Sequence, residues 1–571
     1  MNTLTSSLIT LANIFLNART IRVLILSTFS LYWLVLLHIP WPNNGDYGMN
    51  LPMNLLCWGV MSMLSLLVWL FLRTATVRIT RTSILMLASA VLFTLPILWS
   101  PSEGLPTALP RLVGIWGGVL CYVTLLQVPL QEKETTGIFY LLAIAAVVEC
   151  LISLAGLYCP AYLPFPLNNL AENYSGYAPG IFQQLNVTAS FLATGLVALL
   201  FVLADARCVC YRVRAESYRL LFICVSIIVI SATLVVFHSR TGWLGGLIGI
   251  LCVSVMFSHP RFRVRTTSRR RLLVVLLPFA GGLLGMLMLN QPLDASLAHE
   301  SSSNQRMLTL EYTLRMIGVH PWRGWGLGMF EPAFQNFMAA LPFDNLSREM
   351  MQHPHNETLF IWAEGGVMAL AGGLCLLWGW IILFLRRKSL WQWAALLTTL
   401  PILLHTQVEF PLYYSVAHYF AILILMASAD GELRTFQVRS SRLRWPLVFI
   451  ALYGLVLSAQ LFFASIVLGN FETGRLAFPE SITGLHVPGL MQMRYQRDLS
   501  QLHLWHFNQT GDIDELERYA KENGVWIKLH MEEDAWNDQV NILLFSHRQD
   551  DAEKLKQRAH RLMPWDVRFK S

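Results

Sequence analysis

Long apolar stretches separated by short polar segments dominate the chain up to about residue 470. Each stretch is about 17–25 residues long, the length that a helix needs to cross a hydrocarbon layer of about 30 Å. Backbone groups in lipid must be hydrogen-bonded within their own segment, so we expect helices rather than open sheets. About thirteen stretches meet this length criterion, which predicts an all-α polytopic membrane protein. The predicted spans begin near Ile21, Leu55, Ile84, Leu112, Ile138, Val187, Leu220, Trp243, Leu272, Leu359, Trp391, Leu412 and Pro446.

Positively charged residues collect in alternate loops between the predicted spans. The intervening short loops contain few Lys or Arg residues, and residues 160–185 contain none. Because short basic loops stay on the cytoplasmic side, this alternation places the N-terminus in the cytoplasm. The basic loops are residues 73–81, 207–214, 261–271, 386–388 and 434–444.

This topology divides the chain into five parts. Residues 1–20 form a cytoplasmic N-terminus, and residues 21–289 carry the first nine spans. Residues 290–357 form a long external loop, residues 358–468 carry four more spans, and residues 469–571 form an external tail. We find no short apolar region followed by a small-residue cleavage site, so we expect the first stretch to be a retained helix.

The tail differs from the rest of the chain and is predicted to form helical hairpins. Two of its segments, residues 512–522 and 550–562, combine acidic starts with helical apolar spacing. Asp512-Ile-Asp514 imitates a carboxylate pair that holds a metal and a nucleotide-sugar. At a helix start, a cap with first-turn negative charge is the favoured interpretation.

Composition supports a membrane protein and argues against nucleic-acid binding. Hydrophobic residues make up 55% of the chain and charged residues only 13%, and the mean hydropathy is +0.49. A soluble domain of this length carries more charge. The net charge of +7 comes from residues in short loops between spans, so it is no sign of a nucleic-acid surface.

Two candidate clusters lie at the external ends of predicted spans, where polar groups are costly and tend to mark a function. Gln184 and Asn186 enter the sixth span and could donate hydrogen bonds to sugar or phosphate. Capping of the helix is an equally good interpretation. Arg240 stands in a short hairpin on the side where positive charge is scarce. Its guanidinium suits bidentate phosphate binding, with a membrane-interface anchor as the alternative.

The segment His353-Pro-His355-Asn356 lies at the mouth of the tenth span. Pro354 and Asn356 suit a helix start, so His355 would lie beside free backbone N–H groups that attract phosphate. A neutral imidazole there can accept a proton from an attacking hydroxyl. Ordinary interfacial histidines are one alternative. A metal site is another, although no third ligand follows nearby.

Further candidates lie in the long loop and between the eleventh and twelfth spans. Arg306 belongs to a set of spaced arginines, and residues 321–328 form a glycine-rich run. The run lacks a preceding strand, so we reject a dinucleotide loop and expect the glycines to allow close packing. His405 and Glu409 form a weaker patch, in which Glu409 could orient a histidine or a sugar or merely face water.

Together these residues resemble the bacterial O-antigen ligase and polymerase superfamily. Within it, the pattern is most similar to protein O-oligosaccharyltransferases that glycosylate pilins and other exported proteins. The resemblance runs from about Leu141 to Met426, and one departure is Phe410, where related enzymes often carry Tyr. It rests on Gly180 through Asn186, Ser239-Arg240, Arg306 with Pro321 through Gly328, His355-Asn356 through Glu364-Gly365, and His405 through Leu412.

The resemblance implies a GT-C-like glycosyltransferase in the bacterial inner membrane, with its active site and C-terminus in the periplasm. It implies en bloc transfer of an oligosaccharide from undecaprenyl pyrophosphate to Ser or Thr hydroxyls of an exported, pilin-like protein. We assign His355 as general base and Arg240, Arg306 and Asn356 to the donor pyrophosphate. No cofactor or metal is required. The predicted positioning residues for donor or acceptor are Gln184, Asn186, His353, His405 and Glu409.

Other functions stay open at this stage. An O-antigen ligase acting on lipid A–core shares the expected fold, as does an O-antigen polymerase, and the sequence carries no readable code for the acceptor. A lipid or glycan transporter would place polar residues through the middle of the bundle and often show internal repeats. The span interiors are instead largely apolar and we find no repeat, so a transporter is disfavoured, and a purely structural scaffold more so.

Overall fold

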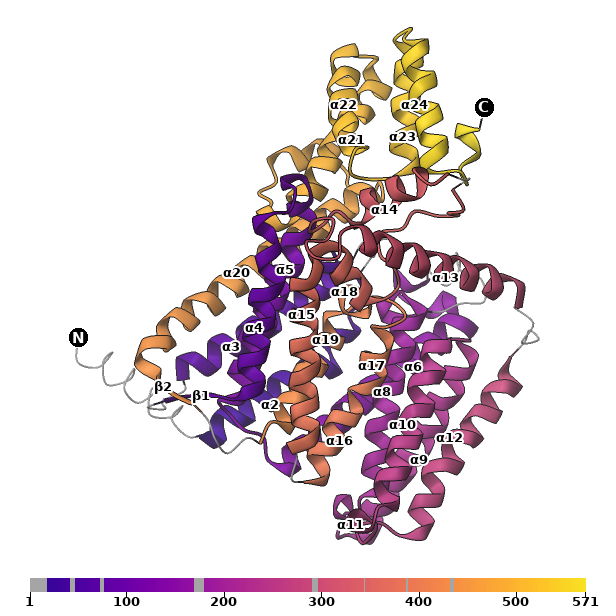
Figure 1. Ribbon diagram of the computed structural model, residues 1–571. Helices are drawn as coiled ribbons and strands as arrows, with labels where there is room; N and C mark the ends of the chain where they lie inside the picture. Colours follow the sequence, from indigo (N-terminus) through magenta and orange to yellow (C-terminus); the bar gives the residue numbers. More distant parts are fainter. Residues whose placement is uncertain are drawn as a thin grey trace.

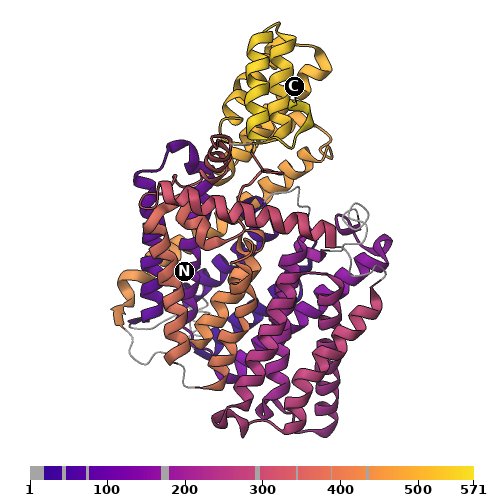
Figure 2. The ribbon, with the colours of Figure 1, turned by 45° about the vertical axis from the view of Figure 1, so that its right-hand side comes forward.

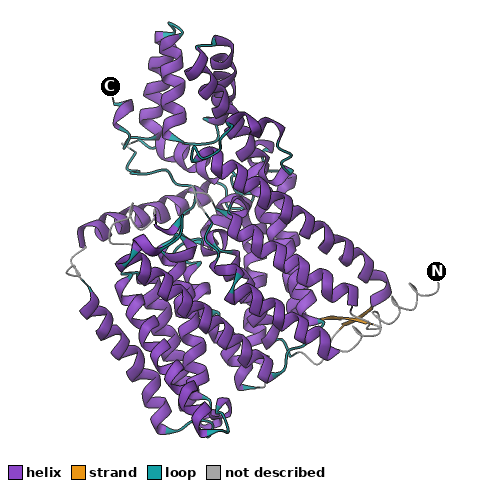
Figure 3. Cartoon of the chain, turned by 180° about the vertical axis from the view of Figure 1, so that it is seen from behind, coloured by secondary structure: helices purple, strands orange, loops and turns teal. Residues whose placement is uncertain are grey.

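The computed structural model describes the chain in eight stretches. They are residues 18–41, 47–71, 76–168, 179–289, 296–342, 345–386, 389–431 and 436–570. Within them the chain is predominantly helical, as Figure 3 shows from behind. The helices of the main bundle are α2 (Ala18–Leu34), α3 (Pro52–Phe71), α4 (Arg81–Thr94), α5 (Leu105–Leu126), α6 (Glu132–Tyr158), α8 (Leu185–Ala204), α9 (Val213–Val236), α10 (Arg240–Ser258), α12 (Ser268–Met288), α15 (Glu357–Arg386), α16 (Leu390–Thr398), α17 (Leu400–His405), α18 (Pro411–Tyr414), α19 (Val416–Ala429) and α20 (Ser440–Glu472).

The predicted class, an all-α polytopic membrane protein, is confirmed. Eleven helical segments among the described residues are long and apolar enough to cross a membrane. Two other predicted spans correspond to shorter apolar helices, Leu390–His405 and Val416–Ala429. The predicted start at Leu412 falls in α18. The helical backbone is interrupted at Ser415, which is extended, and α19 begins after it.

Helix α8 forms the centre of the bundle. Its spanning window is 100% buried inside the protein, whereas the other candidate spans are between 22% and 56% buried. The helix packs against α6, α9 and α10 and consists almost entirely of Leu, Val, Ala, Phe, Thr and Ser. A helix that is apolar all round has no face for water and is expected in a protein core or in a membrane, and its complete burial places α8 in the core of the bundle.

One end of the bundle carries the long loop and the tail, and we call it the distal end (Figures 1 and 2). Helix α13 (Ser296–Val319) runs across the ends of the spanning helices. Helix α14 (Phe330–Ala339) follows it and lies beneath the tail. A small apolar cluster that includes Met316, Phe334 and Phe360 joins these two helices to the start of α15.

The opposite end of the bundle carries basic connections. Helix α11 (Pro260–Arg263) lies there, as do the strands β1 (Thr76–Ile79) and β2 (Phe436–Arg439) (Figure 1). The strands form an antiparallel pair in which Thr76 faces Arg439. Basic connections at one end and the long loop at the other agree with the alternation seen in the sequence.

The tail forms helical hairpins, as the sequence predicts. Asp512 caps α22 by accepting a hydrogen bond from the Asp514 N–H at 3.0 Å, so the carboxylate pair serves a helix start. The tail is also docked on the long loop, because the Met531 N–H donates to Glu331 of α14 at 2.7 Å. Its helices are α21 (Gln492–Thr510), α22 (Ile513–Trp526), α23 (Glu533–Phe545) and α24 (Gln549–Leu562).

Candidate active site

A buried carboxylate, Glu409, brings four of the predicted site residues together at the distal end. Its Oε1 atom accepts hydrogen bonds from Asn186 Nδ2 at 2.7 Å and from Arg306 Nη2 at 2.6 Å. Its Oε2 atom accepts from Gln184 Nε2 at 3.0 Å and lies 3.2 Å from His405 Nε2. Only 4% of Glu409 is exposed. The two sequence patches around Gln184 and Glu409 therefore form one site, which we call the carboxylate centre.

Gln184 caps a helix, which is one of the two interpretations that the sequence left open, and its amide nitrogen donates within the protein. Its Oε1 atom caps α8 by accepting the Val187 N–H at 2.7 Å, while its Nε2 atom donates to Glu409. The chain reaches this position through a tight turn at residues 180–182, followed by Gln183 in the left-handed region at φ 55°. One amide thus stabilises the helix start and fixes one carboxylate oxygen.

Asn186 connects the carboxylate centre to the start of α10. Its Oδ1 atom accepts a hydrogen bond from Ser239 Oγ at 2.7 Å. The same Ser239 oxygen caps α10 by accepting the Gly242 N–H at 3.1 Å. Arg240 follows directly as the first residue of α10, and its side chain is exposed. The second sequence cluster is therefore joined to the first through a hydrogen-bonded helix cap.

The ionisation of Glu409 follows from its partners. Burial by itself would raise the pKa of Glu409, because the charged form loses its hydration. The hydrogen bond with His405 and the positive charge of Arg306 outweigh burial and lower the pKa of Glu409 to about 2. The carboxylate is therefore ionised at neutral pH and acts as an acceptor only.

His355 lies close to this centre in an unusual backbone conformation. Its φ of 56° is in the left-handed region, and its N–H donates to His353 Nδ1 at 2.9 Å. The His355 Nδ1 atom is buried and has no hydrogen-bond partner among the described residues. A buried polar atom without a partner carries a desolvation cost, so it is a candidate for binding a substrate group.

Burial lowers the pKa of His355 to about 4. The positive charge of Arg306 and the neighbouring His353 add to this effect, while the negative charge of Glu409 opposes it. The imidazole is therefore neutral at physiological pH and able to accept a proton. Its electrostatic coupling to Glu409 and Arg306 ties it to the carboxylate centre without a direct hydrogen bond.

His353 supports His355 rather than facing open space. Its ring packs between Phe360, at a centroid distance of 4.5 Å, and Phe410, at 4.3 Å. Its Nδ1 atom accepts the His355 N–H, which fixes the turn at His355. Phe410, the departure noted from related sequences, thus contributes an apolar ring face that holds His353.

Asn356 caps α15, and this corrects one expectation from the sequence. Its Oδ1 atom accepts the Leu359 N–H at 2.9 Å, and its Nδ2 atom donates to the Gln407 carbonyl at 3.1 Å. The Glu357 N–H donates to the Thr406 carbonyl at 2.9 Å. The expectation that this helix start presents free N–H groups to an anion is therefore wrong for Glu357 and Leu359. These groups are used to join the helix to the loop before Glu409.

The glycine-rich run packs against a kink in α15. The Gly326 N–H donates to the Glu364 carbonyl at 3.0 Å, and the Val367 N–H donates to the Trp322 carbonyl at 3.2 Å. Gly366 has φ 63° and ψ −156°, which breaks the helical backbone. A Cβ on Gly366 would lie 2.2 Å from the Trp322 oxygen. Close backbone packing thus accounts for these glycines.

Three polar residues near the site, Arg111, Ser190 and His418, were not identified from the sequence. Arg111 of α5 forms an ion pair with Glu364 and lies over the Phe360 ring at 4.7 Å. A charged residue directly before the predicted span at Leu112 was an available signal for it. Ser190 contacts His405 at 2.8 Å and His418 at 3.2 Å. Ser190 follows Asn186 by one helical turn, so the spacing of polar residues on α8 could have revealed it.

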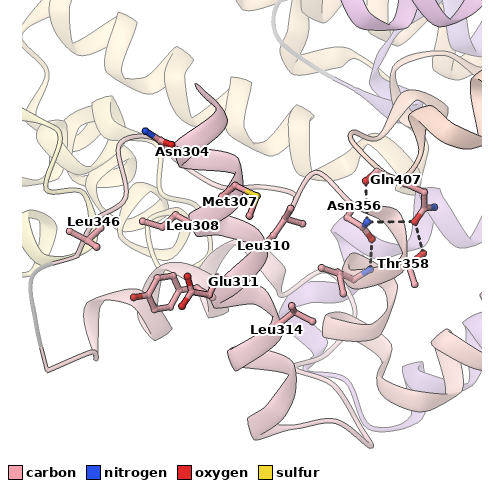
Figure 4. Close-up of a pocket in the computed structure, with 12 residues that line it drawn as sticks. Asn304, Met307, Leu308, Leu310, Glu311, Leu314, Leu346, Asn356, Thr358 and Gln407 are labelled. Atoms are coloured by element: carbon pink, nitrogen blue, oxygen red, sulfur yellow. Dashed lines mark hydrogen bonds between the residues drawn. The ribbon is translucent and has the colours of Figure 1, made fainter. Parts of the chain in front are cut away.

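A pocket of about 910 Å³ borders the segment that carries His355 (Figure 4). One wall is formed by apolar side chains of α13, including Met307, Leu310 and Leu314. The other wall contains Asn356 and Gln407, which are hydrogen-bonded to each other. Among the residues that the structure describes, no group of three or more His, Cys, Asp or Glu residues is placed to hold a metal ion.

Two family models match successive parts of the chain. Residues 224–374 match the O-antigen ligase model, and residues 393–519 match the C-terminal model of a virulence-factor membrane-bound polymerase. Arg240, Arg306 and His355 fall in the first match, and Glu409 falls in the second. A comparison with curated proteins finds no match. The matches support the O-antigen ligase and polymerase superfamily and a glycan-transfer function of that type.

Proposed function

We propose that this protein transfers an oligosaccharide en bloc from undecaprenyl pyrophosphate to Ser or Thr hydroxyls of an exported, pilin-like protein. The distal end would face the periplasm, and the spans would lie in a bacterial inner membrane. The observation that carries the proposal is the His355 Nδ1 atom beside an arginine–carboxylate centre. This atom is buried, neutral and without a hydrogen-bond partner among the described residues. Glycan transfer from a lipid pyrophosphate needs both a base and a cationic group that holds the leaving phosphate.

The proposed chemistry is a single displacement at the anomeric carbon of the glycan. His355 accepts the proton from the acceptor hydroxyl, whose oxygen forms the new bond to that carbon. The bond from the same carbon to the pyrophosphate oxygen breaks, and the electron pair leaves with the pyrophosphate. Fixed geometry and charge stabilisation supply the rate enhancement, since pyrophosphate is already a good leaving group.

The two arginines would hold the pyrophosphate from different helices. Arg306 is held by Glu409 through one nitrogen at 2.6 Å, which leaves the rest of its guanidinium available for a second anion. Arg240 is exposed at the first turn of α10, next to the Ser239 cap. Bound pyrophosphate adds negative charge near His355, which raises its pKa and makes it a stronger base in the complex. No cofactor or metal is needed for these steps.

The resemblance of two sequence pieces to protein O-oligosaccharyltransferases favours protein glycosylation over the lipopolysaccharide alternative. Gln184 and Asn186 belong to one piece and His405 and Glu409 to the other, and the resemblance to protein O-oligosaccharyltransferases depends most on these pieces. They meet on a single carboxylate. The docked helical tail adds a protein surface beside the site for an acceptor protein to contact.

The test is glycan transfer by the purified protein supplied with lipid-linked oligosaccharide. A pilin-like protein and lipid A–core are offered in parallel, and His355→Ala is compared with wild type. We expect transfer to the protein, reduced at least 100-fold in the variant, because general-base catalysis contributes about 10²–10⁴-fold. Transfer only to lipid A–core would reassign the acceptor. A fully active His355→Ala variant would remove the proposed base.

A further inference from the structure

A row of buried polar side chains continues inward from the carboxylate centre. His405 Nδ1 lies 2.8 Å from Ser190 Oγ, which lies 3.2 Å from His418 Nε2. His418 Nδ1 in turn lies 2.8 Å from Ser415 Oγ. These four side chains come from α8, α17, α19 and the residue before α19, and their exposed fractions are all 0%. No part of the reaction proposed above uses Ser190, His418 or Ser415.

Two groups that can only accept, Glu409 and the Val187 carbonyl, determine where the hydrogens of the two histidines lie. Ionised Glu409 only accepts, so His405 Nε2 carries a hydrogen. The Val187 carbonyl also only accepts and lies 3.1 Å from His418 Nε2, so that nitrogen carries a hydrogen too. His418 Nδ1 is then bare and accepts from the Ser415 hydroxyl. The tautomers of His405 and His418 are thus assigned from their hydrogen-bond partners.

Ser190 completes the row in one direction. His405 Nδ1 lies 2.8 Å from Ser190 Oγ and accepts the hydrogen of that hydroxyl, for which the Val187 carbonyl at 3.0 Å is a second acceptor. The Ser190 oxygen then accepts from His418 Nε2–H. Every donor in the row therefore points toward Glu409, and each buried group has a partner. Such a fully satisfied network fixes the position and tautomer of its members, whereas a partly satisfied one is costly in a low-dielectric interior.

On the basis of the transfer reaction proposed above, we propose that Ser190 and His418 are positioning residues that hold the His405 ring and, through it, the Glu409 carboxylate. Glu409 in turn holds Arg306, Gln184 and Asn186 by hydrogen bonds. Packing alone does not call for this row, since apolar side chains of similar shape would fill the core without the cost of burying polar groups. The row keeps a single negative charge at a defined place beside Arg306.

The test compares kinetic constants per folded enzyme for Ser190→Ala, His418→Phe and His418→Gln. Ser190→Ala removes one oxygen and leaves His405 Nδ1 without a donor. We expect kcat to fall about 10- to 100-fold, because displacement of a reacting constellation by about 1 Å costs up to 100-fold. His418→Phe should show a similar loss. His418→Gln keeps an N–H donor for Ser190 and should recover part of the rate.

The matched control is Ser428→Ala. Ser428 is buried like Ser190 and lies on the same helix as His418, α19. Its hydroxyl donates to the Ile424 carbonyl of that helix at 2.7 Å and contacts no member of the row. This variant should retain wild-type kcat and KM. If His418→Phe does not fold, Ser190→Ala decides the question, because it removes only one oxygen atom.

The outcomes separate the two levels of the proposal. Folded Ser190→Ala with wild-type kcat and KM, alongside an active wild-type enzyme, would overturn the positioning role alone. Absence of transfer by the wild-type enzyme to any acceptor would overturn the proposed function and the positioning role with it. A loss of kcat in Ser190→Ala and His418→Phe, with partial recovery in His418→Gln, would support the positioning role. A folding defect would instead lower the amount of folded enzyme and leave kcat and KM of the folded fraction unchanged.

Discussion

At the scale of single residues, the site combines groups with opposite electrostatic requirements. The proposed pyrophosphate site calls for positive charge, yet the carboxylate of Glu409 lies among its residues. Glu409 is tolerated because Arg306, His405 and two amides surround it with donors. Its negative charge is thus compensated locally, and it keeps the arginine side chain in one orientation.

Replacement of Arg306 by Lys tests this arrangement. A lysine provides one point charge and cannot bind Glu409 and a phosphate oxygen with separate planar nitrogens. We expect the KM for the lipid-linked donor to rise about tenfold or more, from the loss of a charge-assisted hydrogen bond of about 1.5–3 kcal/mol. Arg315→Lys is the control, because Arg315 lies on the same helix in an exposed ion pair with Glu311. Equal effects in both variants would contradict a specific role for Arg306.

The pH dependence of kcat/KM tests the state of His355. An acting base must be unprotonated, so activity is lost as the pH falls through its pKa. Because burial lowers the pKa of His355 to about 4, the acid limb should lie near pH 4 rather than near 6.5. Arg306→Gln removes a charge that lowers this pKa, so its acid limb should move to higher pH. A wild-type limb near pH 6.5 would argue against a buried base.

At the scale of elements, the site depends on three joined helix starts. The caps of α8, α10 and α15 are Gln184, Ser239 and Asn356, and each is hydrogen-bonded to another part of the site or to the loop beside it. Helix starts tolerate such residues because their first N–H groups need external acceptors. The polar residues needed for capping therefore also connect the site.

Gly366→Ala tests the contact between the glycine-rich run and α15. Its left-handed backbone disfavours any Cβ, and the added atom would meet the Trp322 oxygen at 2.2 Å. We expect the free energy of unfolding to fall by about 1–3 kcal/mol, measured as a lower Tm in detergent. Gly137→Ala in α6 is the control, because a Cβ there meets no atom within 4 Å. An unchanged Tm for Gly366→Ala would mean that the loop moves freely away from the kink.

At the scale of the whole molecule, the structure separates two ends with different chemistry. The long loop, the tail and the carboxylate centre share the distal end, whereas β1, β2 and α11 lie at the other (Figure 1). The alternation of basic loops predicts which end faces the cytoplasm. The membrane orientation is thus a prediction about the molecule as a unit.

Reporter fusions test that orientation. A fusion after Lys388 should report a cytoplasmic location, because residues 386–388 form one of the basic loops. A fusion after Asn470 should report a periplasmic location, because the tail shares the distal end with the site. The reverse pattern would place His355 and its neighbours on the cytoplasmic side and exclude a periplasmic transfer reaction.

The sequence by itself determined the class of fold and most of the spans, and it supplied the candidate site residues. Those properties are local, because span length, helix caps and charge alternation are each encoded within a few tens of residues. His355, Arg306, Gln184, Asn186, His405 and Glu409 could therefore be identified as candidates before any contact was known.

Only the tertiary structure decided how these residues are connected. Gln184 and Glu409 are 225 positions apart in the chain and meet only because α8 and the loop after α17 converge at one end of the bundle. The same packing makes Asn356 a helix cap and joins Ser190 to two histidines. It also buries the His355 Nδ1 atom, which has no partner in the part of the chain that the structure describes. Hydrogen-bond partners and desolvation depend on neighbours distant in sequence, so no local pattern encodes them.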